Sequence, residues 1–154
     1  MVDASSEASA AALRAVLSTL LCGLALLVAV VVYAHARATG LTPSAERVRA
    51  DNGLTMVAMA VAAALVVVSE AFWRGIIRGG GRVKKAFIVR AALREAAAMS
   101  GLFAALVCAR HGVLRLYPAY WANLAPLGLF VVFAKLHWPT AAGLDAEVAE
   151  ILPK

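Results

Sequence analysis

The residues of this chain best suited to chemistry are an arginine and a glutamate that stand side by side in an apolar run. Residues 92–106 read ALREAAAMSGLFAAL, so Arg94 and Glu95 are surrounded by apolar or small side chains. In a membrane-spanning helix an ionisable side chain is costly, on the order of 3 kcal/mol on insertion scales, and is therefore a candidate functional residue. Such a pair could carry a proton or an ion, or it could hold helices together.

Counter-charges for this run are available one segment earlier in the chain. Arg90 and Arg94 are four residues apart and share a helix face, whereas Glu95 is turned by about 100° from Arg94. A hairpin that turns at Gly80 sets Glu70 opposite Arg90, with Arg94 within reach. We therefore expect one charge cluster, made up of Glu70, Arg90, Arg94 and Glu95. A structural clamp between helices is one interpretation, and a site for a proton, an ion or a lipid headgroup is the other.

The elements that must position these charges are four apolar segments. Of the 154 residues, 63% are hydrophobic, against about 45–50% in soluble domains, which indicates a membrane protein. About 20 residues of helix cross the hydrocarbon core, and backbone in lipid must satisfy its own hydrogen bonds, so each segment is expected to be a helix. The predicted fold is all-α, a single domain over residues 1–154 with four transmembrane helices in an antiparallel bundle. The predicted spans are residues 13–36, 54–73, 86–109 and 120–136.

The first apolar segment has a second interpretation as a signal peptide. It ends on Ala34, His35 and Ala36, which fit the A-x-A pattern of a cleavage site. Against cleavage, the preceding residues MVDASSE are acidic where a signal is basic, and the apolar run exceeds the roughly 7–15 residues of a typical signal. A membrane span is the favoured interpretation.

The distribution of basic residues predicts the orientation of the bundle. Residues 74–85, between the second and third spans, hold five positive charges and no acid, which places this loop in the cytoplasm by the positive-inside rule. With four spans both termini are then cytoplasmic, as expected for a multi-pass protein of the bacterial inner membrane, with residues 137–154 as a cytoplasmic tail. The net charge of +6 is thus explained by topology, and no nucleic-acid partner is expected.

The tail carries the pattern of a short amphipathic helix. Leu144, Val148, Ile151 and Leu152 recur at helical spacing, with acidic residues between them. This helix would lie on the same side of the membrane as the basic loop. The acidic tail is expected either to rest against that loop or to remain a solvated, fraying end.

Rows of small residues predict where helices approach closely. Ala97, Gly101 and Ala105 form such a row on the third span. On the second span, the corresponding rows are Ala58 with Ala62 and Ala60 with Ala64. These rows indicate packing surfaces, either inside the bundle or between copies of the chain.

No catalytic or metal-binding set is evident. His35, His111 and His137 are scattered at the ends of spans with no paired carboxylate in the sequence nearby, which favours interfacial packing. Cys22 and Cys108 fall in apolar runs without metal-ligand spacing and are expected to be buried thiols. We therefore expect no enzymatic activity, no cofactor and no metal.

Two resemblances to known protein families add to these predictions. The run from Glu95 to Leu106 resembles the second helix of rotary ATP synthase c subunits, in which a carboxylate is followed by small residues and a Gly-Leu pair. That resemblance implies that Glu95 binds and releases a transported ion. The chain departs from the family in having four apolar segments in place of two and in placing Arg94 beside the carboxylate, which favours its charged form.

The whole chain resembles a group of small bacterial four-span membrane proteins. The features that carry the resemblance are the ALREA motif of the third span, the apolar run that precedes it from Lys85, and the segment LHWPT before an acidic helix. This resemblance implies the four-span architecture and no particular reaction.

Two functions follow as expectations. The first is a non-enzymatic membrane protein, a structural or interaction subunit that contacts the lipid bilayer and either copies of itself or a larger membrane complex. The second is a proton- or ion-translocating protein, or a small transporter component, with Glu95 as the titrating carboxylate.

Overall fold

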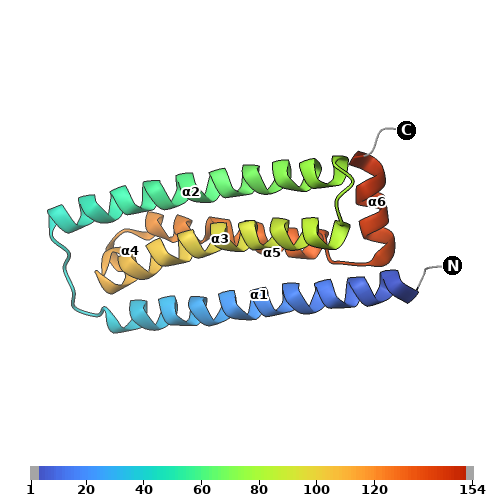
Figure 1. The fold of residues 1–154 in the computed structure, drawn as a ribbon. Coiled ribbons are helices and arrows are strands. Elements are labelled where there is room, and N and C mark those ends of the chain that lie inside the picture. Colours follow the sequence, from blue (N-terminus) through green and yellow to red (C-terminus); the bar gives the residue numbers. More distant parts are fainter. Residues whose placement is uncertain (1–3, 152–154) are drawn as a thin grey trace.

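A computed structural model describes residues 4–151, and all of the secondary structure within them is helical. Successive long helices run in opposite directions, so the predicted all-α antiparallel bundle is confirmed (Figure 1). The elements in chain order are α1 (Ala4–Arg37), α2 (Ala45–Arg78), α3 (Val83–Arg110), α4 (Val113–Leu116), the 3-10 helix η1 (Pro118–Leu124), α5 (Ala125–Leu136) and α6 (Ala141–Ile151).

Four segments of the described chain are long and apolar enough to cross a membrane, which makes it a multi-pass membrane protein. They are Glu7–Arg37, Ala45–Arg78, Val83–Arg110 and Pro118–Leu136. Each includes one predicted span and extends beyond it. The second span shows why: the hydroxyl of Ser44 accepts a hydrogen bond from the backbone N–H of Arg47 at 3.3 Å, and this cap starts α2 well before its apolar residues.

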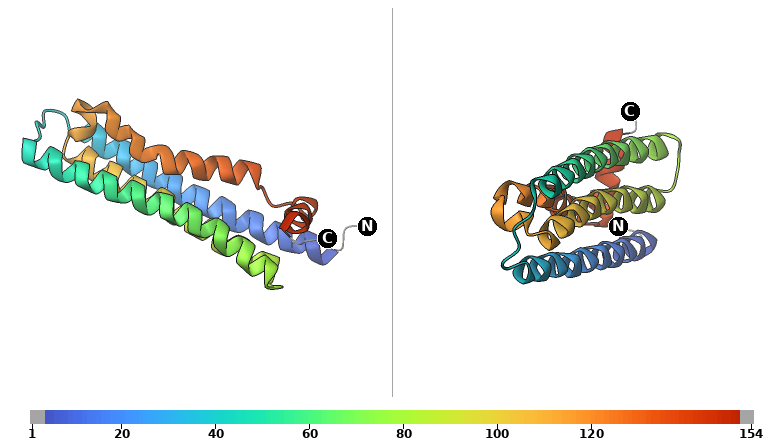
Figure 2. Two further views of the ribbon diagram at one scale, coloured as in Figure 1. Left: turned by 90° about the horizontal axis from the view of Figure 1, so that it is seen from above. Right: turned by 90° about the vertical axis from the view of Figure 1, so that its left-hand side faces the viewer.

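The helix that carries the charges, α3, lies at the centre of the bundle. It packs against α1, α2, η1 and α5, and the end-on view shows α1 and α2 on either side of it (Figure 2). Large apolar side chains such as Leu26 of α1, Val67 of α2 and Leu129 of α5 are exposed on the outer surface, where lipid would contact them. Arg90 of this helix is only 5% exposed, so the neighbouring helices shield that charge from lipid.

The fourth span is irregular, and α3 accommodates it with a glycine. Pro118 opens the 3-10 helix η1, and Pro126 lies in the first turn of α5, where its missing N–H breaks no helical hydrogen bond. A Cβ at Gly101 of α3 would overlap the carbonyl oxygen of Asn123 and lie 3.2–3.3 Å from the ring of Pro126. Gly101 of the predicted small-residue row therefore packs inside the bundle, against the junction of η1 and α5.

The other members of the small-residue rows divide between the interior and the surface. Ala97 and Ala105 of α3 are buried, as are Ala58 and Ala62 of α2. The remaining row on α2, Ala60 with Ala64, is exposed on the outside of the bundle.

The C-terminal helix α6 is docked across one end of the bundle (Figure 1). The hydroxyl of Thr140 caps it by accepting from the N–H of Gly143 at 3.1 Å. Leu144 is buried and Val148 and Ile151 are partly buried against the core, while Leu152 lies outside the described residues. The predicted amphipathic helix is thus present, and it packs on the bundle with its apolar side.

Candidate functional site

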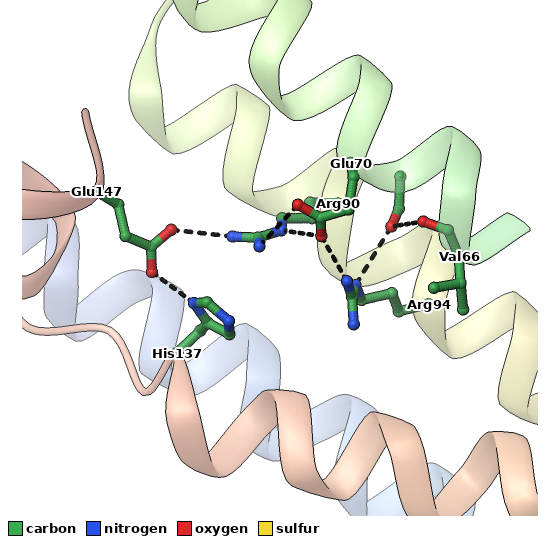
Figure 3. A network of polar contacts seen from close by, with 7 residues as sticks. Val66, Glu70, Arg90, Arg94, His137 and Glu147 are labelled. Carbon is green, nitrogen blue, oxygen red and sulfur yellow. Dashed lines mark hydrogen bonds and ion pairs between the residues drawn. The ribbon is translucent and has the colours of Figure 1, made fainter. Parts of the chain in front are cut away.

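The centre of the candidate site is Arg90, a buried arginine whose three guanidinium nitrogens each donate to a carboxylate of the chain. Its Nε donates to Glu70 Oε1 at 2.8 Å and its Nη2 donates to Glu70 Oε2 at 3.0 Å, a two-pronged contact between α3 and α2 (Figure 3). Its Nη1 donates to Glu147 Oε2 of α6 at 2.9 Å. Charge-assisted pairs with this geometry are stronger than neutral hydrogen bonds and orient both partners.

One turn further along α3, Arg94 contacts the same carboxylate. Its Nη2 donates to Glu70 Oε1, and its Nε donates to the hydroxyl of Ser69 at 3.2 Å. That hydroxyl in turn donates to the carbonyl of Val66 at 2.6 Å (Figure 3). Arg90 and Arg94 meet one partner because residues four apart share a helix face.

Aromatic rings lie against both guanidinium groups. The Cζ of Arg90 lies 5.2 Å from the ring centre of Trp73 and 5.1 Å from that of Phe133. The Cζ of Arg94 lies 4.4 Å from the ring centre of Phe133. Cations at these distances from an aromatic face are stabilised electrostatically, so α5 contributes to the site through Phe133.

The network extends to α6 through Glu147 and His137. Glu147 Oε1 lies 2.6 Å from His137 Nδ1, while its other oxygen accepts from Arg90 (Figure 3). The expectation that His137 lacks a carboxylate is therefore wrong, because α6 folds back and returns Glu147 to it. Neither residue was a predicted site residue. A signal was available, because a buried arginine has five N–H donors and a single carboxylate does not satisfy them all.

The structure does not bring Glu95 into this network. Its side chain is half-buried, and within residues 4–151 it makes no hydrogen bond or ion pair. The reason is helical geometry, since one residue after Arg94 corresponds to a turn of about 100° away from Glu70. Of the predicted cluster, the structure places Glu70, Arg90 and Arg94 together and leaves Glu95 apart.

A polar cavity of about 310 Å³ opens beside Arg90. Arg74 and Arg78 at the end of α2 line it together with Glu150 of α6. Among the described residues these groups form no direct ion pair, so the acidic helix faces the basic end of α2 across a cavity. The tail's direct ionic contacts, made by Glu147, are with Arg90 and His137 instead.

A second polar cluster lies at the opposite end of the α2–α3 pair. His111 Nδ1 lies 3.0 Å from both carboxylate oxygens of Asp51, which is 2% exposed. One turn along α2, the hydroxyl of Thr55 accepts from Asn123 Nδ2 of η1 at 3.1 Å and lies 3.9 Å from the thiol of Cys108. The prediction that His111 has no carboxylate partner is thus also wrong, because α2 begins early enough to bring Asp51 against it.

Cys22 and His35 are the cysteine and the histidine that lie outside both clusters. Cys22 is exposed on α1, so the prediction of two buried thiols holds only for Cys108. His35 packs edge-on against Trp121, with ring centres 5.2 Å apart. Within residues 4–151, no group of three His, Cys, Asp or Glu side chains is arranged to hold a metal ion.

Comparison with known proteins gives no relative: no protein-family model, curated protein or solved structure matches the chain. The geometry of the charged network is therefore the basis for a functional assignment.

Proposed function

We propose that the protein is a non-enzymatic multi-pass membrane protein, a structural or interaction subunit in which Glu70, Arg90 and Arg94 clamp α2 to α3. The observation that carries this proposal is the pairing of Arg90. Its Nε, Nη1 and Nη2 each donate to a carboxylate of the same chain, and Trp73 and Phe133 cover its guanidinium. A polar cavity opens beside Arg90, but each of its guanidinium nitrogens is already paired with a carboxylate of the chain, and this arrangement favours a structural role.

The outer surface supports a role in association. Ala60 and Ala64 form a small-residue row on the exposed side of α2, next to exposed apolar side chains such as Val57 and Val61. Small residues four apart let two transmembrane helices approach closely. Copies of the chain or a larger membrane complex are the proposed partners.

The proposed location is the bacterial inner membrane, with the α6 end of the bundle in the cytoplasm. The basic residues between α2 and α3 support this orientation through the positive-inside rule. Labelling of single cysteines placed in that loop and in the α1–α2 link of intact cells tests it. Labelling of the α2–α3 loop from outside the cell would show that the orientation is the reverse of the one proposed.

A second candidate function is proton or ion translocation through Glu95. The observation in its favour is that Glu95 is half-buried in a span and has no ionic partner within the described residues. A carboxylate without a fixed counter-charge is free to take up and release a proton.

Reconstitution into proteoliposomes tests the two functions together, with proton flux and thermal unfolding measured for the parent and for Arg94→Gln and Glu95→Gln. A clamp predicts no flux in the parent, lower stability for Arg94→Gln and unchanged stability for Glu95→Gln. Flux in the parent that Glu95→Gln abolishes at unchanged stability would reject the clamp as the function and support the second candidate.

A further inference from the structure

A groove of about 380 Å³ lies between α1 and α3 at the end of the bundle opposite α6. Val30, Leu106 and Leu41 give it apolar walls, and Arg37 and Arg110 stand at its rim with Tyr33. Both arginines are the last residues of their helices and directly follow the predicted spans 13–36 and 86–109, so the rim is expected at the membrane interface. The groove is therefore polar at the interface and apolar toward the interior of the membrane.

Close backbone packing builds the groove. Gly112 has φ +76°, a left-handed conformation that favours glycine, and a Cβ there would lie 3.0 Å from the Cβ of Leu41. Leu41 of the α1–α2 link is consequently held against the end of α3. At the rim, Arg37 Nε donates to the hydroxyl of Tyr33 at 3.1 Å, which orients the guanidinium and leaves its terminal nitrogens available.

The charge at this end of the bundle is unbalanced. Within residues 4–151, neither Arg37 nor Arg110 forms an ion pair with a carboxylate. The nearby segments, residues 37–53 and 110–119, contain five arginines but only two acids, Glu46 and Asp51. Asp51 is buried against His111, so it does not neutralise the rim.

We propose that this groove binds an anionic phospholipid, with the phosphate between Arg37 and Arg110 and one acyl chain along Val30 and Leu106. Two guanidinium groups complement a phosphate by paired hydrogen bonds, and the apolar wall requires a ligand that continues into the hydrocarbon core. Phosphatidylglycerol has a net negative charge, whereas the choline cation of phosphatidylcholine cancels its phosphate and would face the two unpaired arginines, so phosphatidylglycerol is the favoured ligand. The site is separate from the Arg90 network and does not depend on the clamp.

Native mass spectrometry of the detergent-solubilised chain tests the proposal, with phosphatidylglycerol and phosphatidylcholine of identical acyl chains as probes. The double variant Arg37→Gln/Arg110→Gln is compared with Arg47→Gln/Arg115→Gln, which removes the same charge from the same end but outside the groove. A third variant, Leu106→Trp, fills the apolar wall and keeps both arginines. Thermal unfolding of each variant verifies that it is folded.

The parent is expected to retain one phosphatidylglycerol in preference to phosphatidylcholine. Arg37→Gln/Arg110→Gln should weaken that adduct at least about tenfold, the size expected for losing charge-assisted contacts to phosphate. Leu106→Trp should also weaken it, whereas the control double variant should retain it. Equal losses in the two double variants, equal retention of the two lipids by the parent, or displacement of the lipid by inorganic phosphate alone would each overturn the proposal.

Discussion

At the end of the bundle that α6 covers, Arg90 of α3 joins Glu70 of α2 to Glu147 of α6, whereas at the opposite end Asp51 of α2 meets His111 of α3. The first end brings permanent charges of both signs together from three helices. The second buries one carboxylate against a side chain whose charge depends on protonation. Buried charge is tolerated at both ends because each group has a partner, but only at the first end does an ion pair tie a further helix, α6, to the bundle.

Toward the second end, close backbone contacts at two glycines hold neighbouring segments in place, where the first end uses ion pairs. Gly101 admits the carbonyl of Asn123, and Gly112 admits the loop residue Leu41. These contacts fix η1 and the α1–α2 link without using ionisable groups. Within the described residues, Arg37 and Arg110 form no ion pair at that end, whereas Arg90 and Arg94 near the α6 end are paired with carboxylates.

The largest expected effect comes from removing the centre of the charged end. Arg90→Met leaves Glu147 without its arginine and removes the bidentate partner of Glu70, so the free energy of unfolding should fall by about 3–5 kcal/mol. A denaturant titration in detergent measures it. The control is Arg82→Met, which removes an exposed arginine from the start of α3. Similar stabilities for the two variants would contradict a central role for Arg90.

A smaller loss is expected from steric disruption toward the second end. Gly101→Ala forces the carbonyl of Asn123 and the ring of Pro126 away from α3, at a cost of about 1–3 kcal/mol. Gly128→Ala is the matched control, since no atom lies within 4 Å of a Cβ at Gly128. The same titration applies, and a neutral Gly101→Ala would show that α3 and η1 are not in close contact.

The smallest losses of stability are expected from replacing one histidine by glutamine at each end of the bundle. His111→Gln leaves Asp51, 2% exposed, without its imidazole and should cost about 1–2 kcal/mol. His137→Gln leaves Glu147 paired with Arg90 and partly exposed, so it should cost under about 1 kcal/mol. Thermal unfolding of the two variants ranks them. A larger loss of stability for His137→Gln than for His111→Gln would contradict the expected difference between the two ends.

Much of the fold is predictable from sequence because apolar length and hairpin geometry are local properties. The four spans follow from hydropathy, and the turn near Gly80 is short enough for its register to bring Glu70 to Arg90. Residues at equal distances from a tight turn face each other. A substantial part of the charged network is therefore encoded in one hairpin.

The missing parts of the site depend on properties that are not local. Glu147 reaches Arg90 only because the link after α5 reverses the chain, and Asp51 reaches His111 because α2 begins at Ala45, far ahead of its apolar residues. Glu95 illustrates the opposite case. It adjoins Arg94 in sequence, but the helix directs it away from Glu70.

The docking of α6 also sets an order of events during synthesis. Ribosomes make the chain from its N-terminus, so α2 and α3 are complete before Glu147 exists. Until then, Arg90 and Arg94 share the single carboxylate of Glu70. Translation of α6 supplies the second carboxylate, so the pairing of Arg90 is complete only after that helix has been made.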